Sequence, residues 1–573
     1  MADSPFQYSA ERGIIGPGAS RSTRVRRPRH PIASAVAFAV SAIVLLPIAS
    51  LVLIAFSGGA EEWGYLFRSI LPKASFTTIS LLFAVAASTT VLGVATAWLV
   101  VAFEFPARRF FSWALVLPLA VPPYLAAYAF AEFFLYTGPV QSLLRAAFGF
   151  RSMRDYWFPD IRSTGGAAFV MASVLYPYVY LTARIVFLMQ GRNIADVART
   201  LGAAPWKVFW RVLLPVARPA IAAGVALVLM ETINDIGASE YLGVQTLTVS
   251  VYSTWLNRGS LEGGAQVALV MLFLVLVLLF AEDRARQRQR FHTTRGTHLK
   301  VRPQRIPLKG WRKLLALAVA TVPVLCGFGI PLYVFGSYAL RRLDQIASPD
   351  LASSFLSSLL TASTASLLTV MLALFLINAV RLSRSHSMRV AVRLASIGYA
   401  LPGGIIGLGL LFVLARFDNA VDALLRSSLG ISTGLLISGT AAAVVLACTI
   451  RFLALAEGAV RSGIEKLPPN LDEAARSLGR SPLGSAASVL LPLLSPAILT
   501  ALVLVFVDTI KELSATILLR PFGFNTLATF VYENASRGVP EDGAIAALAI
   551  IVTALVPVVL LSGALMRDKE AAM

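Results

Sequence analysis

One segment of the chain is present twice. Residues 196–221 read DVARTLGAAPWKVFWRVLLPVARPAI, and residues 473–498 read EAARSLGRSPLGSAASVLLPLLSPAI. The two copies align without a gap when residue 473 is set against residue 196. Both keep a glycine and a Leu-Pro pair at matching positions: Gly202, Leu214 and Pro215 in the first copy, and Gly479, Leu491 and Pro492 in the second. A gapless match of this kind indicates an internal duplication, so we expect two structural repeats.

The match continues into the apolar segment that follows each copy. The stretch 231–235, ETIND, lies over 508–512, DTIKE, and Ser239 lies over Thr516. Each stretch carries two acids four residues apart, which places both acids on one face of a helix. The duplication therefore gives each repeat an acidic stripe within an apolar segment.

The composition indicates a membrane protein. Of the 573 residues, 57% are hydrophobic and 14% are charged, and the mean hydropathy is +0.74. Soluble domains carry about 25% charged residues. Twelve apolar runs have about the 20 residues that a helix needs to cross a bilayer: 32–56, 76–103, 110–136, 167–189, 217–236, 264–281, 314–338, 353–380, 391–415, 431–455, 495–513 and 543–566. We expect an all-α polytopic protein of about twelve transmembrane helices in two parallel six-helix repeats.

Basic residues set the expected orientation and boundaries. Arginines crowd the tail 1–31, and 282–313 is the most basic stretch of the chain. Lys and Arg concentrate on the cytoplasmic side of membrane proteins, so both stretches are expected to be cytoplasmic. The repeats are then 32–281 and 314–566, and the C-terminal tail 567–573 is cytoplasmic too. The exception is the loop 138–166, which this count places outside although it carries arginines as well as Asp155 and Asp160.

The charge and the cysteines exclude other classes of site. The formal net charge of +20 comes from residues that flank apolar spans, which argues against a nucleic-acid partner and for contact with the lipid bilayer. Cys326 and Cys448 lie in separate apolar runs, and the four histidines lie in basic stretches. These positions predict neither a disulfide framework nor a metal cluster.

Two polar segments, 190–216 and 456–494, are expected on the cytoplasmic side, and we call them the coupling segments. Each predicts a short amphipathic helix, a glycine turn, a second short helix and a Leu-Pro pair before the next span. Glu473-Ala474-Ala475 with Gly479, Leu491 and Pro492 resembles the EAA motif of binding-protein-dependent ABC importers. The first copy has Asp196-Val197-Ala198, a mild departure.

This resemblance implies the type I permease fold and a set of partners. A binding protein in the periplasm would deliver the substrate, and a separate ATPase, in two copies, would dock on the coupling segments from the cytoplasm of a bacterial cell. The residues implied in that contact are Asp196, Ala198, Gly202, Leu214, Pro215, Glu473, Ala474, Ala475, Gly479, Leu491 and Pro492. None of the eight lysines follows a glycine, so the chain lacks a P-loop, and we expect ATP to bind only to the partner.

The residues 231–255 and 508–535 look most like the fused permeases for ferric iron. Related fused permeases carry thiamine, phosphonates or polyamines, and these substrates remain alternatives. Two functions of another class are an ATPase-independent secondary transporter and a membrane enzyme such as a lipid transferase. The coupling segments argue against the first, and the lack of a nucleophile paired with a base argues against the second.

The intramembrane stripes are the candidate translocation pathway. Charge within a membrane is costly and usually functional. The stripes are formed by Glu231, Asp235, Ser239, Asp508, Glu512 and Thr516. Oxygen ligands suit a hard cation, although a permease must release its cargo and is not expected to hold a high-affinity metal site. The alternative is structural: these acids cap helix ends and pair with Lys511 and Arg520.

The third span of each repeat is interrupted. Pro118 and Pro122-Pro123 break the first repeat, and Pro402-Gly403-Gly404 breaks the second. Such breaks are tolerated where neighbours or a cavity satisfy the freed backbone groups, so they predict either a gate or a packing kink.

Overall fold

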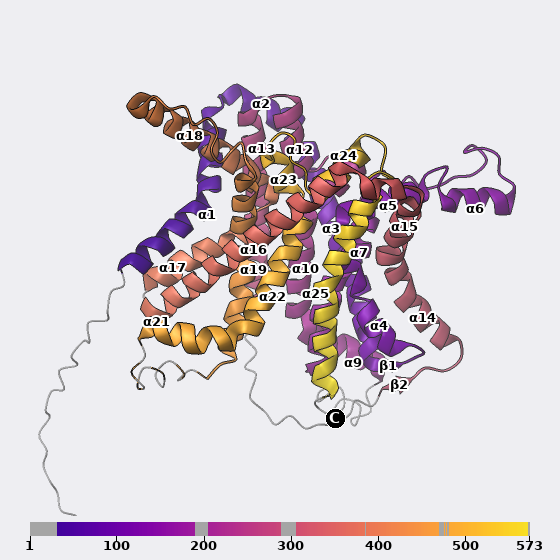
Figure 1. Ribbon diagram of the computed structural model, residues 1–573. Coiled ribbons are helices and arrows are strands. Elements are labelled where there is room, and N and C mark those ends of the chain that lie inside the picture. The colour runs from indigo at the N-terminus through magenta and orange to yellow at the C-terminus, as the bar shows by residue number, and fades with distance from the viewer. Residues whose placement is uncertain are drawn as a thin grey trace, which may run out of the picture.

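The computed structural model describes residues 31–189, 204–287, 305–383, 386–468 and 481–570, together with Leu471, Ala475, Ser477 and Gly479. Within these residues the protein is a bundle of helices with one pair of two-residue parallel strands, β1 (Phe103–Glu104) and β2 (Ile306–Pro307) (Figure 1). Ten helical stretches are long and apolar enough to cross a membrane, and Arg108–Ala120 with Pro123–Phe148 forms a further pair bent by 95°. The prediction of an all-α polytopic fold is confirmed.

The first repeat contains the following elements: α1 (Pro31–Ser57), α2 (Ala60–Ser69), α3 (Leu71–Ala102), α4 (Arg108–Ala114), α5 (Pro123–Phe134), α6 (Pro139–Phe148), α7 (Thr164–Met189), α9 (Pro205–Val208), α10 (Leu214–Asn234), α11 (Ile236–Tyr241), α12 (Leu247–Tyr252) and α13 (Leu261–Gln287). The second contains α14 (Trp311–Val324), α15 (Ile330–Arg341), α16 (Pro349–Ser383), α17 (His386–Ala395), α18 (Gly403–Leu429), α19 (Ala441–Glu465), α21 (Pro482–Ser485), α22 (Leu491–Ile510), α23 (Ser514–Leu519), α24 (Leu527–Ser536) and α25 (Ala544–Glu570).

The two repeats share local structural features at equivalent positions. A π-helical turn joins α9 to α10 at Phe209–Leu213, and another joins α21 to α22 at Ala486–Leu490. The two turns coincide in the gapless alignment of the repeats. A buried contact is duplicated as well. The Leu247 N–H donates to Thr78 Oγ1 at 2.9 Å, and the Leu527 N–H donates to Ser358 Oγ at 2.6 Å.

Two predicted spans of the second repeat are placed differently. The predicted span 431–455 is wrong at its start, because α19 begins at Ala441 and continues to Glu465. The predicted span 391–415 is divided between α17 and the long α18, which ends at Gly430 in the left-handed conformation. Asp418 explains the loop between α18 and α19, since its buried carboxylate accepts hydrogen bonds from the N–H groups of Ile437 and Ser438. The second coupling segment, predicted from residue 456, therefore begins within the last turns of α19.

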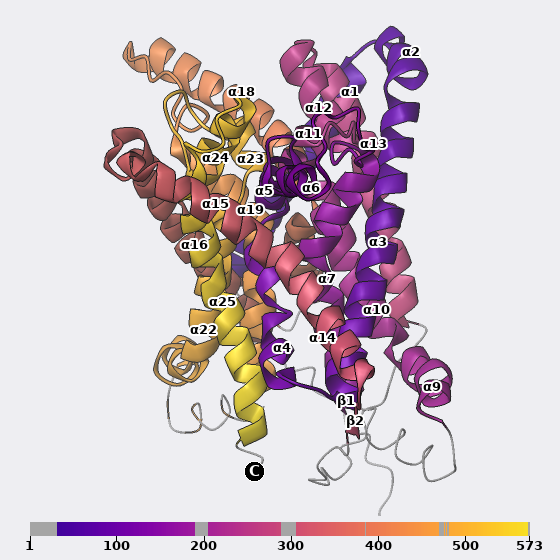
Figure 2. The ribbon, with the colours of Figure 1, turned by 90° about the vertical axis from the view of Figure 1, so that its right-hand side faces the viewer.

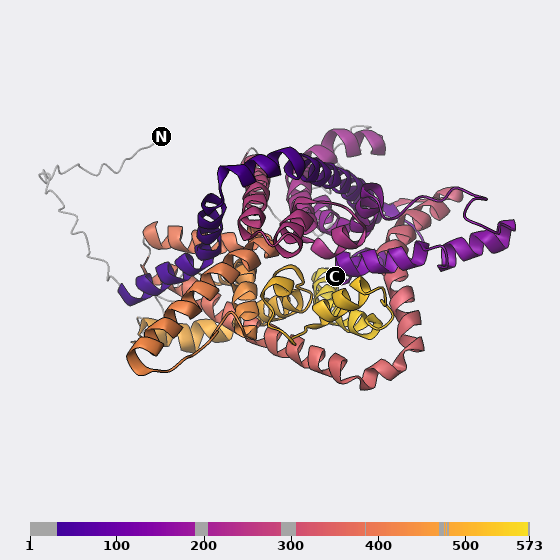
Figure 3. The same ribbon diagram turned by 90° about the horizontal axis from the view of Figure 1, so that it is seen from above.

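The two repeats are interlocked through their first helices. Helix α1 packs against α17 and α18 of the second repeat as well as against α13 (Figure 3). Ser41 Oγ donates to the Ala391 carbonyl at 2.7 Å, and Ser50 Oγ donates to the Gly409 carbonyl at 2.9 Å. Reciprocally, α15 packs against α5 of the first repeat, where the Tyr338 hydroxyl donates to Glu132 at 2.8 Å. Neither repeat is thus a separate packing unit.

The described helices have two distinct ends. Helices α9 and α21, the β1–β2 pair and the end of α25 lie at one end of the bundle (Figures 1 and 2). Helices α2, α12 and α24 and the outer part of α18 lie at the other end. Figure 2 shows α9 and the beginning of α22 on opposite sides of their shared end, well apart from one another. We call this the coupling end, because the described parts of both coupling segments lie there, and we call the other the opposite end.

Candidate functional site

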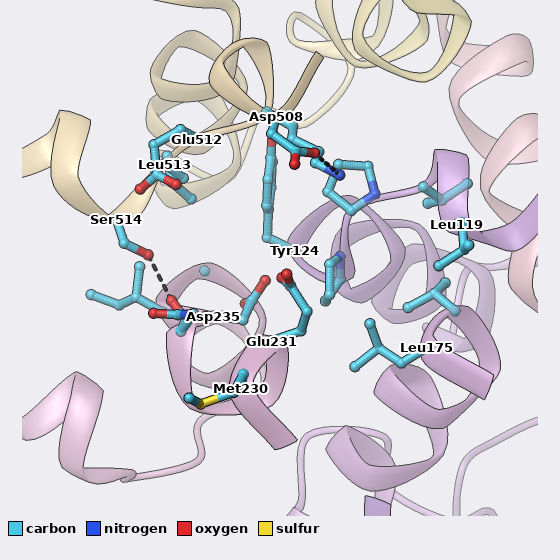
Figure 4. Close-up of a pocket in the computed structure, with 18 of the residues that line it drawn as sticks. Leu119, Tyr124, Leu175, Met230, Glu231, Asp235, Asp508, Glu512, Leu513 and Ser514 are labelled. Carbon is cyan, nitrogen blue, oxygen red and sulfur yellow. Dashed lines mark hydrogen bonds and ion pairs between the residues drawn. The ribbon is translucent and has the colours of Figure 1, made fainter. Parts of the chain in front are cut away.

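A cavity of about 80 Å³ lies between the two repeats. It is lined by the ends of α10 and α22, the beginning of α5, and residues of α7 and α19. All four acids of the predicted stripes line it, two from each repeat: Glu231, Asp235, Asp508 and Glu512 (Figure 4). The structure thereby brings together side chains that are far apart in the sequence.

The acids lie here because both spans break at equivalent points. Helix α10 ends at Asn234, Asp235 is extended (φ −82°, ψ 106°), and α11 follows at once. Asp235 Oδ1 accepts a hydrogen bond from the Ala238 N–H at 2.6 Å and so caps α11. In the second repeat, Glu512 Oε1 accepts from the Ala515 N–H at 2.9 Å. Both acids therefore have a structural role in starting the helix that follows.

The cavity is asymmetric in its positive charges. Lys511 Nζ lies 2.7 Å from Asp508, and the Arg451 guanidinium forms a buried ion pair with Glu512. In the gapless alignment of the repeats, the first repeat has Asn234 in place of Lys511 and Val174 in place of Arg451. Both basic side chains that line the cavity thus come from the second repeat.

The first-repeat acids have no such partner. Neither Glu231 nor Asp235 makes an ion pair with a residue in the described part of the chain. Four carboxylates and two basic side chains leave the cavity with a formal charge of −2 when all are ionised. This charge makes the cavity more favourable for a cation than for an anion.

The ion-pair network around the cavity agrees only in part with the pairs expected from the sequence. The pairing of Lys511 with an acid is observed, but Arg520 bonds to Asn525 and Glu533 instead. Arg451 was missed. Its signal was a single arginine within the apolar run of α19, a position where a charged side chain is costly unless it is paired.

Ser239 and Thr516 lie outside the cavity lining. Both are fully buried, which agrees with their place inside the apolar segment. Thr516 Oγ1 donates back to the Glu512 carbonyl at 3.1 Å. Ser239 Oγ has no hydrogen-bond partner among the residues the structure describes. The predicted stripe thus reaches the cavity only at its acids.

The interrupted third spans lie against the cavity. Pro122 and Pro123 line it directly, and Pro122 and Pro402 precede α5 and α18 in nearly the same extended conformation. The Gly403 N–H donates to Asn234 Oδ1 at 3.1 Å. A Cβ atom at Gly403 would come within 2.8 Å of both Arg451 and Glu512, so only glycine allows the chain to approach the ion pair this closely.

The coupling segments are described in part. Asp196, Ala198, Gly202, Glu473 and Ala474 lie outside the described residues. Two pairs, Leu214-Pro215 and Leu491-Pro492, begin α10 and α22 directly after the π-helical turns, and each proline is the second residue of its helix. Ala475 is buried, and Gly479 adopts the left-handed conformation with φ +81°, as its predicted turn requires.

The helices that lead into the coupling segments are tied to the interrupted spans. On α7, Tyr180 Oη and the Arg184 guanidinium both donate to the Ser112 carbonyl of α4, each at 2.8 Å. On α19, Glu457 accepts hydrogen bonds from Ser396 and from Arg461. Each coupling segment is therefore connected by buried polar contacts to the span that breaks beside the cavity.

Among the described residues, no group of three or more His, Cys, Asp or Glu side chains is placed to hold a metal ion. The four cavity acids are thus arranged around a space rather than gathered on one point.

A family profile described as the binding-protein-dependent transport system inner membrane component matches residues 89–291 and again 381–568. The chain belongs to this family. It is therefore a transport permease, a multi-pass inner-membrane protein with two family domains fused in one polypeptide.

Relatives of known transport systems match either both repeats or one of them. The Fe(3+)-transport system permease protein FbpB 2 of Haemophilus influenzae is 24% identical over 501 residues, which cover 87% of this chain and 90% of that protein. The sulfate transport system permease protein CysT of Escherichia coli is 28% identical over 44% of this chain and 89% of its own length. The molybdenum transport system permease protein ModB of Escherichia coli is 25% identical over 39% of this chain and 94% of its own length. The first relative thus matches both repeats, whereas the other two match about one repeat each.

Proposed function

We propose that this chain forms the whole membrane pathway of an importer for ferric iron. The observation that carries the proposal is the match to a ferric permease along nearly the full length of both chains. The cavity supports it independently, because two first-repeat acids without an ion pair among the described residues leave a net formal negative charge where the spans break. Carboxylate oxygens suit a hard cation.

The chain acts with two partners in this proposal. A periplasmic binding protein delivers the cargo to the opposite end of the bundle. A separate ATPase binds ATP, which this chain does not, and docks in two copies, one on each coupling segment. The positions of α9 and the beginning of α22, on opposite sides of the coupling end, support this stoichiometry. The coupling end and both chain termini are then cytoplasmic.

The rival cargoes differ in charge and are separated by a direct test. Sulfate and molybdate are anions, and a cavity with a formal charge of −2 opposes them. Thiamine and polyamines are cations, and a phosphonate is an anion. The test is uptake of radiolabelled iron, supplied as ferric citrate, in cells that carry this chain with its ATPase and binding protein. We expect iron uptake, and we expect it to stay unchanged when sulfate, molybdate, thiamine, phosphonate or polyamine is added in excess. Uptake of one of these compounds without any uptake of iron would defeat the proposal.

A further inference from the structure

The first repeat carries a stripe of phenol side chains that begins in the cavity. Tyr124, Tyr128 and Glu132 follow one another at intervals of four residues on α5, so they share one face of that helix. Tyr124 lines the cavity beside Glu231 and Asp235 (Figure 4). The ring centroids of Tyr124 and Tyr128 are 5.9 Å apart, so the phenols form a continuous row.

The stripe leads away from the coupling end. The Tyr128 ring packs on that of Tyr241 at 4.5 Å between centroids, and the guanidinium of Arg162 lies 5.2 Å from the Tyr241 ring. Arg162 belongs to the exposed loop between α6 and α7. Glu132, the last member of the stripe, accepts the hydrogen bond from Tyr338. A row of packed aromatic rings thus extends from the cavity, at Tyr124, to Tyr241 beside a surface loop.

Two of these phenols are buried without a hydrogen bond. Tyr124 is 3% exposed and Tyr128 is 1% exposed, and neither hydroxyl has a partner among the described residues. An unsatisfied buried hydroxyl costs about 1–3 kcal/mol. Phenylalanine would fill the same space without this cost. Tyr176 is buried in the same way away from the cavity, so the place of Tyr124 on the cavity, and not burial alone, points to a ligand role.

The second repeat provides an internal comparison. Pro122 directly precedes α5, and Pro402 directly precedes α18. Setting these two prolines against each other aligns the sequences of the helices that follow them. At the positions of Tyr124, Tyr128 and Glu132 the second repeat has Gly404, Leu408 and Phe412. The same helix therefore forms without any oxygen on this face. The oxygens occur in the repeat whose cavity acids make no ion pair with the described residues.

We propose that Tyr124 and Tyr128 are oxygen ligands that ferric iron contacts in turn on its way to Glu231 and Asp235. The proposal rests on the proposed function and deepens it. Phenol and carboxylate oxygens are hard ligands that suit a hard trivalent cation. Coordination of a phenol oxygen releases its proton, so the ligand becomes anionic only when the cation is present. Because the groups follow one another along α5 rather than converging, the ion is passed on and not retained.

Conservative variants separate this role from packing. Tyr124→Phe, Tyr128→Phe and the double variant remove only the phenol oxygens. Tyr176→Phe is the matched control. Tyr176 is also buried, and its hydroxyl has no partner among the residues the structure describes, but it does not line the cavity. All four proteins are expected to unfold at or above the wild-type temperature, because each loses an unsatisfied buried hydroxyl.

The transport assay uses the transporter assembled with its ATPase and binding protein. The double variant is expected to take up ferric iron about tenfold more slowly, the factor that corresponds to about 1.4 kcal/mol of lost ligand interaction. The control is expected to transport like wild type. Equal uptake by wild type and the double variant would overturn the proposal. A wild-type transporter that takes up no ferric iron would instead defeat the proposed function, and the ligand assignment with it.

A spectroscopic measurement tests the same contact without transport. The purified full chain is titrated with ferric nitrilotriacetate, and the visible charge-transfer absorption of ferric phenolates is recorded. The absorption is expected in wild type and in Tyr176→Phe, and it is expected to disappear in Tyr124→Phe/Tyr128→Phe. An absorption of equal strength in the double variant, or none in wild type, would contradict the ligand role.

Discussion

Asp235 and Glu512 hold the same position in the gapless alignment of the repeats, and each accepts a hydrogen bond from the short helix that follows it. Their carboxylates accept hydrogen bonds from the N–H groups of Ala238 at 2.6 Å and Ala515 at 2.9 Å. They differ in their counter-ions, because Glu512 is paired with Arg451 and Asp235 has no ion-pair partner among the described residues. Duplication thus conserved the helix ends while the charge around them diverged.

The ion pair of Arg451 with Glu512 is expected to be required for stability. Arg451→Val introduces the residue of the first repeat and leaves the Glu512 carboxylate buried and unpaired. Removing one partner of a buried pair costs about 3–5 kcal/mol, so the melting temperature should fall markedly. The double variant Arg451→Val/Glu512→Gln should recover most of this loss. Thermal unfolding of the purified chain measures both, and a double variant no more stable than Arg451→Val would refute the pairing.

The first-repeat acids are expected to govern uptake and not stability. Asp235→Asn keeps a good helix-capping side chain and removes its charge. Combined with Glu231→Gln, it should reduce ferric iron uptake about tenfold or more, a loss of at least ~1.4 kcal/mol of cation attraction. Glu61→Gln, an exposed acid on α2, is the matched control. Uptake is measured at equal amounts of membrane-inserted protein. Unchanged uptake in the double variant would remove these acids from the pathway.

The sequence predicted the helical architecture well because its signals are local and repeated. Each predicted span coincides with a described helix or bent pair, apart from the shifted limits around residues 391–455. Those limits failed because the loop before α19 contains apolar residues, Ile431 and Leu435 to Ile437, that extend the apolar run. The loop is held by Asp418, which lies 19 and 20 residues from its partners Ile437 and Ser438. The composition of a segment does not indicate hydrogen bonds to a side chain elsewhere in the chain.

The candidate site was predicted through the duplication. Aligning the two copies identified the four acids, and the structure places all of them on one cavity. Arg451 and the Tyr124–Tyr128 row were not identified, because they interrupt the repeat symmetry instead of following it. The packing of α1 against the second repeat could not be predicted from the sequence either. Helix α1 is uniformly apolar, so its sequence does not indicate which helices it contacts in the folded chain.

The packing of α1 against α18 predicts that a substitution at Gly409 lowers the stability of the protein. A Cβ atom at Gly409 would lie 2.3 Å from the Pro47 carbonyl oxygen, so Gly409→Ala forces α1 away from α18. Overpacking of this kind costs about 1–3 kcal/mol. Gly458→Ala, on α19, is the control, because a Cβ atom there meets nothing within 4 Å. We expect a lower melting temperature for Gly409→Ala and an unchanged or higher one for Gly458→Ala. Equal melting temperatures for Gly409→Ala and wild type would contradict the close packing of α1 on α18.

The turn at Gly479 predicts a coupling defect. Its φ of +81° is strained for alanine, at a cost of about 1–2 kcal/mol, whereas asparagine tolerates this conformation. Gly479→Ala should lower transport per ATP hydrolysed in the assembled complex, and Gly479→Asn should retain most of it. Parallel assays of ATP hydrolysis and iron uptake give the ratio. A ratio that is unchanged in Gly479→Ala would mean that this turn does not contribute to coupling.

Reconstituted transport is the decisive experiment for an ATP-driven ferric iron pathway through this chain. The purified chain is inserted into lipid vesicles with its ATPase and its binding protein, and accumulation of radiolabelled ferric iron is followed over time. We predict accumulation that requires all three proteins and stops when ATP is omitted. Accumulation of iron in vesicles without the ATPase, or ATP-driven accumulation of sulfate in place of iron, would contradict the account.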